Sequence, residues 1–174
     1  VGDGLPDFIG GMTNSFSCGN WDLTALVSFS MGAKIFDSSA KRQLGVVSDW
    51  NMRTELFDRW QQPGDEATFP ILTLDETTYS LPSGFPWWNT SLFIYDASYL
   101  RLRNLTLGYN VPGGKDIRLA INATNLFTLT NFPGLDPEVV RDFENAQDRN
   151  MSANVNYLTP PQERSFTFSI TANF

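Results

Sequence analysis

The C-terminal residues alternate between apolar and polar side chains. Phe166, Phe168, Ile170, Ala172 and Phe174 occupy one phase, and only Ser, Thr and Asn occupy the other. Side chains of successive strand residues point to opposite faces. The period of two therefore predicts a strand over 164–174 that has one apolar and one polar face.

Several earlier segments have the same period and predict further strands. They are Phe8–Ser17, Trp21–Phe36, Tyr99–Val111 and Ile117–Phe127. Between Leu102 and Leu105 the apolar phase slips from even to odd positions. One inserted residue produces such a slip, so we expect a β-bulge around Arg103 and Asn104.

The charged residues inside these segments all fall on the polar phase. They are Asp22, Lys34, Arg101, Arg103 and Arg118. A Lys or Arg that faces lipid near the bilayer midplane costs about 2–4 kcal/mol in a β-barrel. The apolar phase is therefore suited to contact either lipid or a protein core.

The connections alternate between short and long. Tight turns are expected at 18–20 and 112–116, because both are rich in Gly, Asn, Asp or Pro. The segments from about 37 to 96 and from about 128 to 163 exceed the roughly 12–15 residues usual for a loop in a compact domain. Within the first, the spacing of Trp50, Phe57 and Trp60 predicts a short helix over Asp49–Trp60.

The composition excludes several function classes. The chain has 174 residues, of which 41% are hydrophobic, and a net charge of −7, which argues against a nucleic-acid partner. It has no His, so His-dependent catalytic triads and His metal sites are excluded. Its single Cys cannot form an internal disulfide. We expect no enzymatic activity, no cofactor and no bound metal.

The predicted strands, about five in number, cannot close a membrane barrel, which needs at least about eight. An open sheet with an apolar face and bare edges would aggregate, so we expect more strands to complete it. Short turns on one rim and long loops on the other are typical of outer-membrane barrels. The chain begins at Val1 without a signal sequence, and we therefore expect further sequence upstream.

Six short runs, in this order, resemble one protein family. They are Phe8–Met12, Phe29–Phe36, Arg59–Trp60 with Pro63–Asp65, Tyr99–Tyr109, Asn125–Thr128 and Gly134–Val139. Together they are similar to the C-terminal segment of a SusC/RagA-type TonB-dependent outer-membrane transporter. The similarity covers nearly the whole chain.

The resemblance implies an all-β fold, in which antiparallel strands form the C-terminal part of a barrel of about 22 transmembrane strands. The plug domain and earlier strands would lie outside this chain. Residues 37–96 and 128–163 would be extracellular loops, the first with a short helix. The protein would cross the outer membrane of a Gram-negative bacterium many times. It would import oligosaccharides or peptides beneath a SusD-like lipoprotein lid, driven by TonB–ExbB–ExbD through the plug.

Two groups of residues are candidate sites. Trp60, Tyr79, Trp87 and Trp88 lie in the first long loop, where exposed aromatic rings could contact a ligand or the lid. The alternative is that they pack the core of the loop itself. The terminal residues Phe166, Phe168, Ile170 and Phe174 resemble the signal that the outer-membrane assembly machinery reads.

The second long loop is acidic, with Asp136 and Glu138 among its carboxylates. It lacks the spacing of a calcium-binding loop, so we expect a solvated loop. Asp136-Pro137 is expected to form a turn with a local side-chain cap. A rival to the transporter hypothesis is a soluble β-sandwich that binds carbohydrate, in which the apolar phase faces a second sheet.

Overall fold

The computed structural model describes residues 2–45, 51–72, 90–113, 116–139 and 154–173. The chain divides into two compact units. The strand unit comprises Asp3–Lys34, Asp96–Val139 and Pro160–Phe174. The loop unit comprises Val1–Gly2, Ile35–Tyr95 and Val140–Thr159, which correspond to most of the two long connections. Among the described residues, no helix has the length and hydropathy required to cross a bilayer.

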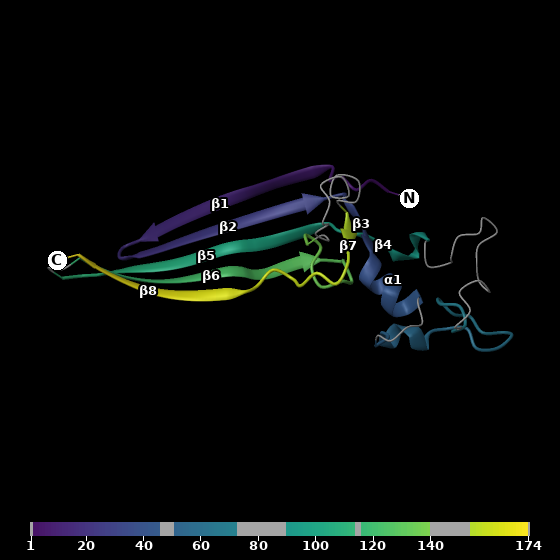
Figure 1. The fold of residues 1–174 in the computed structure, drawn as a ribbon. Coiled ribbons are helices and arrows are strands. Elements are labelled where there is room, and N and C mark those ends of the chain that lie inside the picture. The colour runs from purple at the N-terminus through teal and green to yellow at the C-terminus, as the bar shows by residue number, and fades with distance from the viewer. Residues whose placement is uncertain (1, 46–50, 73–89, 114–115, 140–153, 174) are drawn as a thin grey trace, which may run out of the picture. The chain divides into compact units, whose positions relative to one another are not determined.

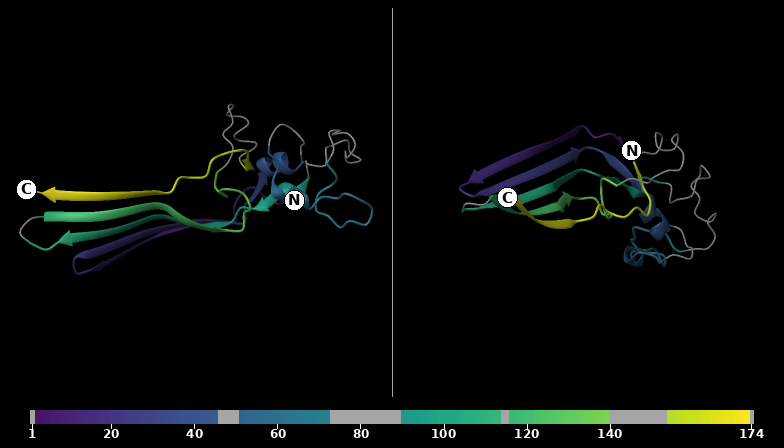
Figure 2. Two further views of the ribbon diagram at one scale, coloured as in Figure 1. Left: turned by 90° about the horizontal axis from the view of Figure 1, so that it is seen from below. Right: turned by 60° about the vertical axis from the view of Figure 1, so that its left-hand side comes forward.

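The strand unit is a five-stranded antiparallel sheet with the order β1-β2-β5-β6-β8. The strands are β1 (Phe8–Cys18), β2 (Trp21–Met31), β5 (Tyr99–Val111), β6 (Asp116–Thr130) and β8 (Ser165–Asn173). They run side by side (Figures 1 and 2). The register places the turn between β1 and β2, the turn between β5 and β6 and the end of β8 at one end of the sheet. At this end the ring centroids of Trp21 and Tyr109 are 4.5 Å apart.

The predicted strands are confirmed except for the second. Trp21–Phe36 is interrupted, because β2 ends at Met31 and a separate strand, β3 (Lys34–Asp37), follows. Gly32 lies between them with a φ of +94°, a conformation that glycine adopts without strain. Lys34 is therefore not in the large sheet and forms an exposed ion pair with Asp96, with its Nζ 2.8 Å from the carboxylate.

The predicted bulge is confirmed and is matched by an irregularity in the next strand. The register between β5 and β6 shifts between Leu102 and Asn104, so Arg103 has no direct partner. On β6, Asn125 and Leu126 are skipped at the same place. Asn125 has a φ of +50°, in the left-handed region that Asn tolerates better than most residues. Both strands therefore bend out of regular pairing at one level of the sheet.

The register aligns apolar side chains across all five strands. One such row contains Phe16, Leu23, Leu107, Ile121 and Phe168. Phe16 and Phe168 are each 62% exposed, and Ile121 is 49% exposed. The apolar face of this sheet is therefore uncovered within the described structure.

The opposite face carries the charges, and one ion pair spans three strands. Arg118 on β6 donates two hydrogen bonds to the Asp22 carboxylate on β2, at 2.6 and 2.7 Å. The intervening residue on β5 is Gly108, where a Cβ atom would overlap the Arg118 guanidinium. The glycine leaves room for the arginine side chain, which crosses directly over the strand.

The loop unit has its own small core. Its regular elements are the helix α1 (Ser38–Gly45), the 3-10 turns η1 (Thr54–Phe57) and η2 (Ser91–Phe93), and a three-stranded sheet of β4 (Ile94–Asp96), β3 and β7 (Val155–Asn156). Its cluster of buried hydrophobic side chains consists, among the described residues, of Ala40, Leu44, Leu56, Phe69 and Phe93. These side chains come from well-separated segments of the first long connection, which therefore folds rather than remaining a simple loop.

The predicted helix over Asp49–Trp60 is wrong. The described part of this range contains only the short 3-10 turn η1. The α-helix of this connection begins earlier, directly after Asp37. The Asp37 carboxylate accepts hydrogen bonds from the backbone N–H groups of Ser39 and Ala40, both at 3.0 Å, and thereby caps the first turn.

Replacing Gly108 with Ala tests the crossing of Arg118 over β5. We expect Gly108→Ala to lower the free energy of unfolding by about 1–3 kcal/mol, because the added methyl group overlaps the guanidinium. In an Arg118→Ala background the same change should cost much less, because the guanidinium is gone and the Asp22 carboxylate, which also lies close to the added Cβ, no longer has the partner that holds it there. Urea unfolding of the four combinations provides the comparison. Equal effects in both backgrounds would contradict the crossing geometry.

Candidate functional site

Two arginines project from β5 beside the paired irregularities. Arg101 and Arg103 both lie on the polar face, and Arg101 is only 2% exposed. A buried guanidinium is costly unless it is paired with a charge and hydrogen-bonded. Both requirements are met by the turn that follows β6.

Asp136 lies in this turn and connects three segments of the strand unit. Its Oδ1 accepts a hydrogen bond from Arg101 Nη2 at 2.5 Å and one from the Glu138 N–H at 3.0 Å. Its Oδ2 accepts a hydrogen bond from the Gln162 N–H at 3.1 Å. The expected cap at Asp136-Pro137 is therefore present. The carboxylate also joins β5 to the segment that leads into β8.

Glu138 completes the cluster. It forms ion pairs with Arg103 and with Arg101, whose Nη1 is 3.3 Å from Glu138 Oε2. Arg103 also donates through Nε to Ser28 Oγ at 2.8 Å and through Nη1 to Gln162 Oε1 at 3.0 Å. The bulge thus directs the Arg103 side chain toward both β2 and the segment that precedes β8.

Electrostatics keep the central carboxylate ionised. Burial alone would raise the pKa of Asp136, but the hydrogen bonds from Arg101 and from the two backbone N–H groups outweigh it. The pKa of Asp136 is therefore below its ordinary value of 3.8. An ionised carboxylate held by a guanidinium is suited to fixing a turn in place, not to donating a proton.

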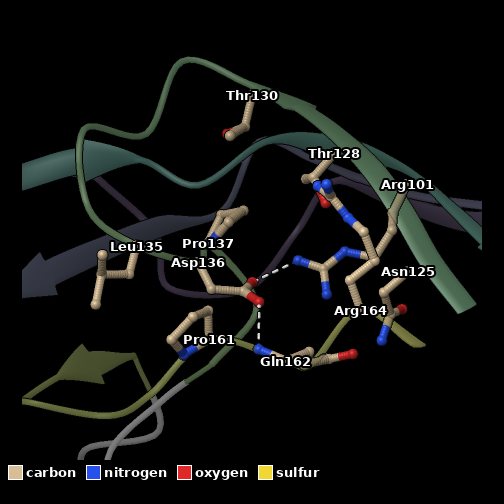
Figure 3. Close-up of a pocket in the computed structure, with 10 residues that line it drawn as sticks. All are labelled: Arg101, Asn125, Thr128, Thr130, Leu135, Asp136, Pro137, Pro161, Gln162 and Arg164. Atoms are coloured by element: carbon tan, nitrogen blue, oxygen red, sulfur yellow. Dashed lines mark hydrogen bonds and ion pairs between the residues drawn. The ribbon is translucent and has the colours of Figure 1, made fainter. Parts of the chain in front are cut away.

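A pocket of about 320 Å³ lies beside the cluster (Figure 3). Its lining includes Arg101, Asn125, Thr128, Asp136, Gln162 and Arg164. Figure 3 shows the Arg101 and Arg164 side chains in this same pocket, reached from β5 and from the residues before β8. We refer to it as the Arg164 pocket.

The cluster corrects the expectation of a solvated acidic loop. Asp136 is 4% exposed and Glu138 is partly buried, and both are paired with arginines. The sequence contains a signal for this arrangement, because two arginines beside a bulge need nearby carboxylates if they are buried. Within the described residues, no group of three or more Cys, Asp or Glu residues is arranged to hold a metal ion.

Of the candidate aromatic residues, the described part of the chain contains Trp60. Trp60 lies in the loop unit, is half-buried, and donates its backbone N–H to the Phe69 carbonyl at 2.8 Å. Tyr79, Trp87 and Trp88 lie outside the described residues.

The candidate assembly signal lies on the last strand. Phe166, Phe168 and Ile170 are on the apolar face of β8, and each is more than 60% exposed. Phe174 lies outside the described residues. These residues are therefore accessible on the sheet's apolar face.

Sequence comparison relates the whole chain to much longer proteins. The chain is 29% identical over 181 aligned positions to TonB-dependent receptor P3 of Formosa agariphila, and the alignment covers 100% of this chain and 17% of that protein. It is 24% identical to TonB-dependent receptor P26 of the same organism, of which it covers 18%. The chain therefore spans less than a fifth of the length of these curated relatives. No protein-family model matches the chain.

Structural comparison gives the same relationship at the level of the fold. The RagAB peptide importer in its closed-closed state matches 98% of this chain with a TM-score of 0.74 and 23% identity, over 17% of the neighbour's chain. The open-open state matches 98% with a TM-score of 0.70 and 22% identity, again over 17%. The resemblance to SusC/RagA-type TonB-dependent transporters is therefore confirmed.

The cluster generates a prediction about acidic pH. Because the pKa of Asp136 is lowered in the folded protein, its stabilising contribution is present above pH 3.8 and is lost as the pH falls through the lowered value. We expect the amides of Glu138 and Gln162 to lose protection from hydrogen exchange in that acidic range. Asp136→Asn should raise their exchange rates by roughly tenfold or more at neutral pH. In this variant the protection of the two amides, relative to their intrinsic exchange rates, should no longer fall in the acidic range.

Asp65→Asn is the matched control, because the Asp65 carboxylate in the loop unit accepts hydrogen bonds from the backbone N–H groups of Gln61 and Gln62. It should affect those two amides and leave Glu138 and Gln162 unchanged. If Asp136→Asn left the exchange of Glu138 and Gln162 as it is in the wild type, the cluster would not fix the turn.

Proposed function

We propose that this chain forms the C-terminal wall of a TonB-dependent β-barrel that imports nutrients across the outer membrane of a Gram-negative bacterium. The observation that carries the proposal is the inverted polarity of the five-stranded sheet. Large apolar side chains on one face are exposed, whereas the charged side chains on the other face are paired and partly or fully buried.

Lipid is the environment that suits such a sheet. On the apolar face, Phe8 is 70% exposed and Phe166 is 66% exposed, and the register continues this face across all five strands. A contiguous apolar surface of this kind is unusual on a protein surrounded by water. In a barrel, the same face contacts the bilayer while the polar face lines the interior.

Closure requires strands beyond those described. β1 and β8 are the edges of the sheet, and each pairs with only one neighbour among the described strands. In a bilayer an unpaired edge leaves backbone groups without hydrogen bonds, which costs several kcal/mol per group. We therefore propose that earlier strands of a barrel of about 22 strands pair with both edges.

The asymmetry of the connections suggests an orientation. The two short turns share the end of the sheet at which the tilted rings of Trp21 and Tyr109 are in contact, and we assign this end to the periplasm. Aromatic rings favour the headgroup layer, and periplasmic turns of outer-membrane barrels are short. The loop unit is then assigned to the extracellular side.

The activity and partners follow from the resemblance. The substrate class would be an oligosaccharide or a peptide, and the fold similarity to a peptide importer supports the second. A SusD-like lipoprotein would cover the extracellular side, and TonB–ExbB–ExbD would act through a plug domain outside this chain. We keep Trp60, Tyr79, Trp87 and Trp88 as candidates for ligand or lid contact, and Phe166, Phe168, Ile170 and Phe174 as the assembly signal.

The rival proposal of a soluble β-sandwich is not favoured. A sandwich buries the apolar faces of two sheets against each other. Here Phe168 and Ile170 are 62% and 65% exposed, so no second sheet among the described residues covers that part of the apolar face.

A pair of lysine substitutions on β8 tests the lipid contact. Phe168 and Ser169 are adjacent, both exposed, and on opposite faces near the middle of the strand. In the complete transporter, Phe168→Lys should lower the free energy of unfolding in lipid vesicles by about 2–4 kcal/mol, whereas Ser169→Lys should cost far less. Urea titration followed by gel mobility of the folded barrel measures both. Comparable costs at the two positions would refute the assignment of faces.

A further inference from the structure

The Arg164 pocket contains a cation that the cluster does not neutralise. Arg101 and Arg103 are balanced by Asp136 and Glu138. Among the described residues, no carboxylate lies within ion-pair distance of Arg164, and its side chain is exposed. The three arginines and two carboxylates at this place therefore leave one positive charge, on the wall of the pocket.

Hydrogen-bond donors surround this charge. The buried Nε of Arg101 has no hydrogen-bond partner in the described structure. The Thr128 side chain lines the pocket, as does Gln162, whose Oε1 is occupied by Arg103 so that its amide N–H groups point away from that contact. The Thr128 hydroxyl and the Gln162 amide can therefore donate hydrogen bonds to an acceptor oxygen of a ligand in the pocket.

The pocket also has an apolar edge and a suitable size. Leu135 lines it and is 75% exposed, and Pro137 and Pro161 contribute further apolar surface. The volume of about 320 Å³ is at the lower end of the range for small-molecule sites. The pocket can therefore hold one charged group together with a short stretch of carbon skeleton.

We propose that the Arg164 pocket binds a carboxylate group of the transported ligand, with Arg164 as the principal cation. A guanidinium binds a carboxylate through two parallel hydrogen bonds. The carboxylate could belong to a peptide or to an acidic sugar, since both present the same group. This inference rests on the proposed function, because it takes the polar face to be the interior through which ligand passes.

Binding of matched charged and neutral probes to the complete transporter in detergent tests the proposal. The peptide probes are N-acetyl-triglycine and its C-terminal amide, and the sugar probes are trigalacturonate and its methyl ester. We expect at least one carboxylate probe to bind more tightly than its neutral counterpart. The binding should weaken as salt is added, because the site is exposed to solvent. The probe pair that shows the difference identifies the source of the carboxylate.

Substitutions assign the binding to this pocket. Arg164→Gln should raise the Kd of the carboxylate probe by roughly tenfold or more. Lys34→Gln removes the same charge from an exposed ion pair elsewhere in the strand unit and should leave the Kd unchanged. Thr128→Val, which removes only a hydroxyl group, should raise it by a smaller factor and serves as the test if Arg164→Gln does not fold.

Three results would overturn the proposal: no binding of either carboxylate probe to the wild-type protein, equal binding of charged and neutral probes, or an unchanged Kd in the Arg164→Gln and Thr128→Val variants. Insertion of the wild-type protein into the outer membrane is measured in the same preparations. A protein that inserts but does not discriminate by charge contradicts only the pocket. A protein that does not insert contradicts the proposed function.

Discussion

The charges of the five-stranded sheet share one face, and the rest of the strand unit depends on this constraint. Asp22, Arg101, Arg103 and Arg118 all project opposite the exposed apolar rows. A charge on the apolar side would cost about 2–4 kcal/mol in a bilayer, so each charge must find a partner on the polar side. The ion pairs on the polar face therefore result from the same segregation of side chains that leaves the opposite face apolar and exposed.

The irregularities in β5 and β6 connect the sheet to the second long connection. Arg103 is an inserted residue. The polar face can therefore carry Arg101, Arg103 and Asn104, while Leu102 and Leu105 stay on the apolar face. The two arginines then hold the turn at Asp136 and Glu138 and the segment before β8. A local departure from regular pairing thus creates both the buried cluster and the Arg164 pocket next to it.

Local patterns were sufficient to predict the bulge and all strands of the large sheet except the end of β2, which stops at Met31. A period of two and a slip in its phase can both be read from neighbouring residues, as at Leu102 and Leu105. The helix α1 was missed because only Ala40 and Leu44 of its residues are buried, against partners such as Phe69 and Phe93 that are distant in sequence. The ion cluster was missed for the same reason, because 35 positions separate Arg101 from Asp136 and a folded turn is needed to bring them together.

The central claim is that the apolar face of this sheet contacts lipid. Spin labels placed singly at 166–171 of the complete protein, from which Cys18 and any other cysteine have been removed, test it most directly in lipid vesicles. We predict a period of two in collision rates. Labels at Phe166, Phe168 and Ile170 should meet dissolved oxygen more often than a water-soluble nickel chelate, and labels at Thr167, Ser169 and Thr171 should show the reverse preference. Accessibility without this alternation, or labels at the three apolar positions shielded from oxygen by protein, would contradict the account.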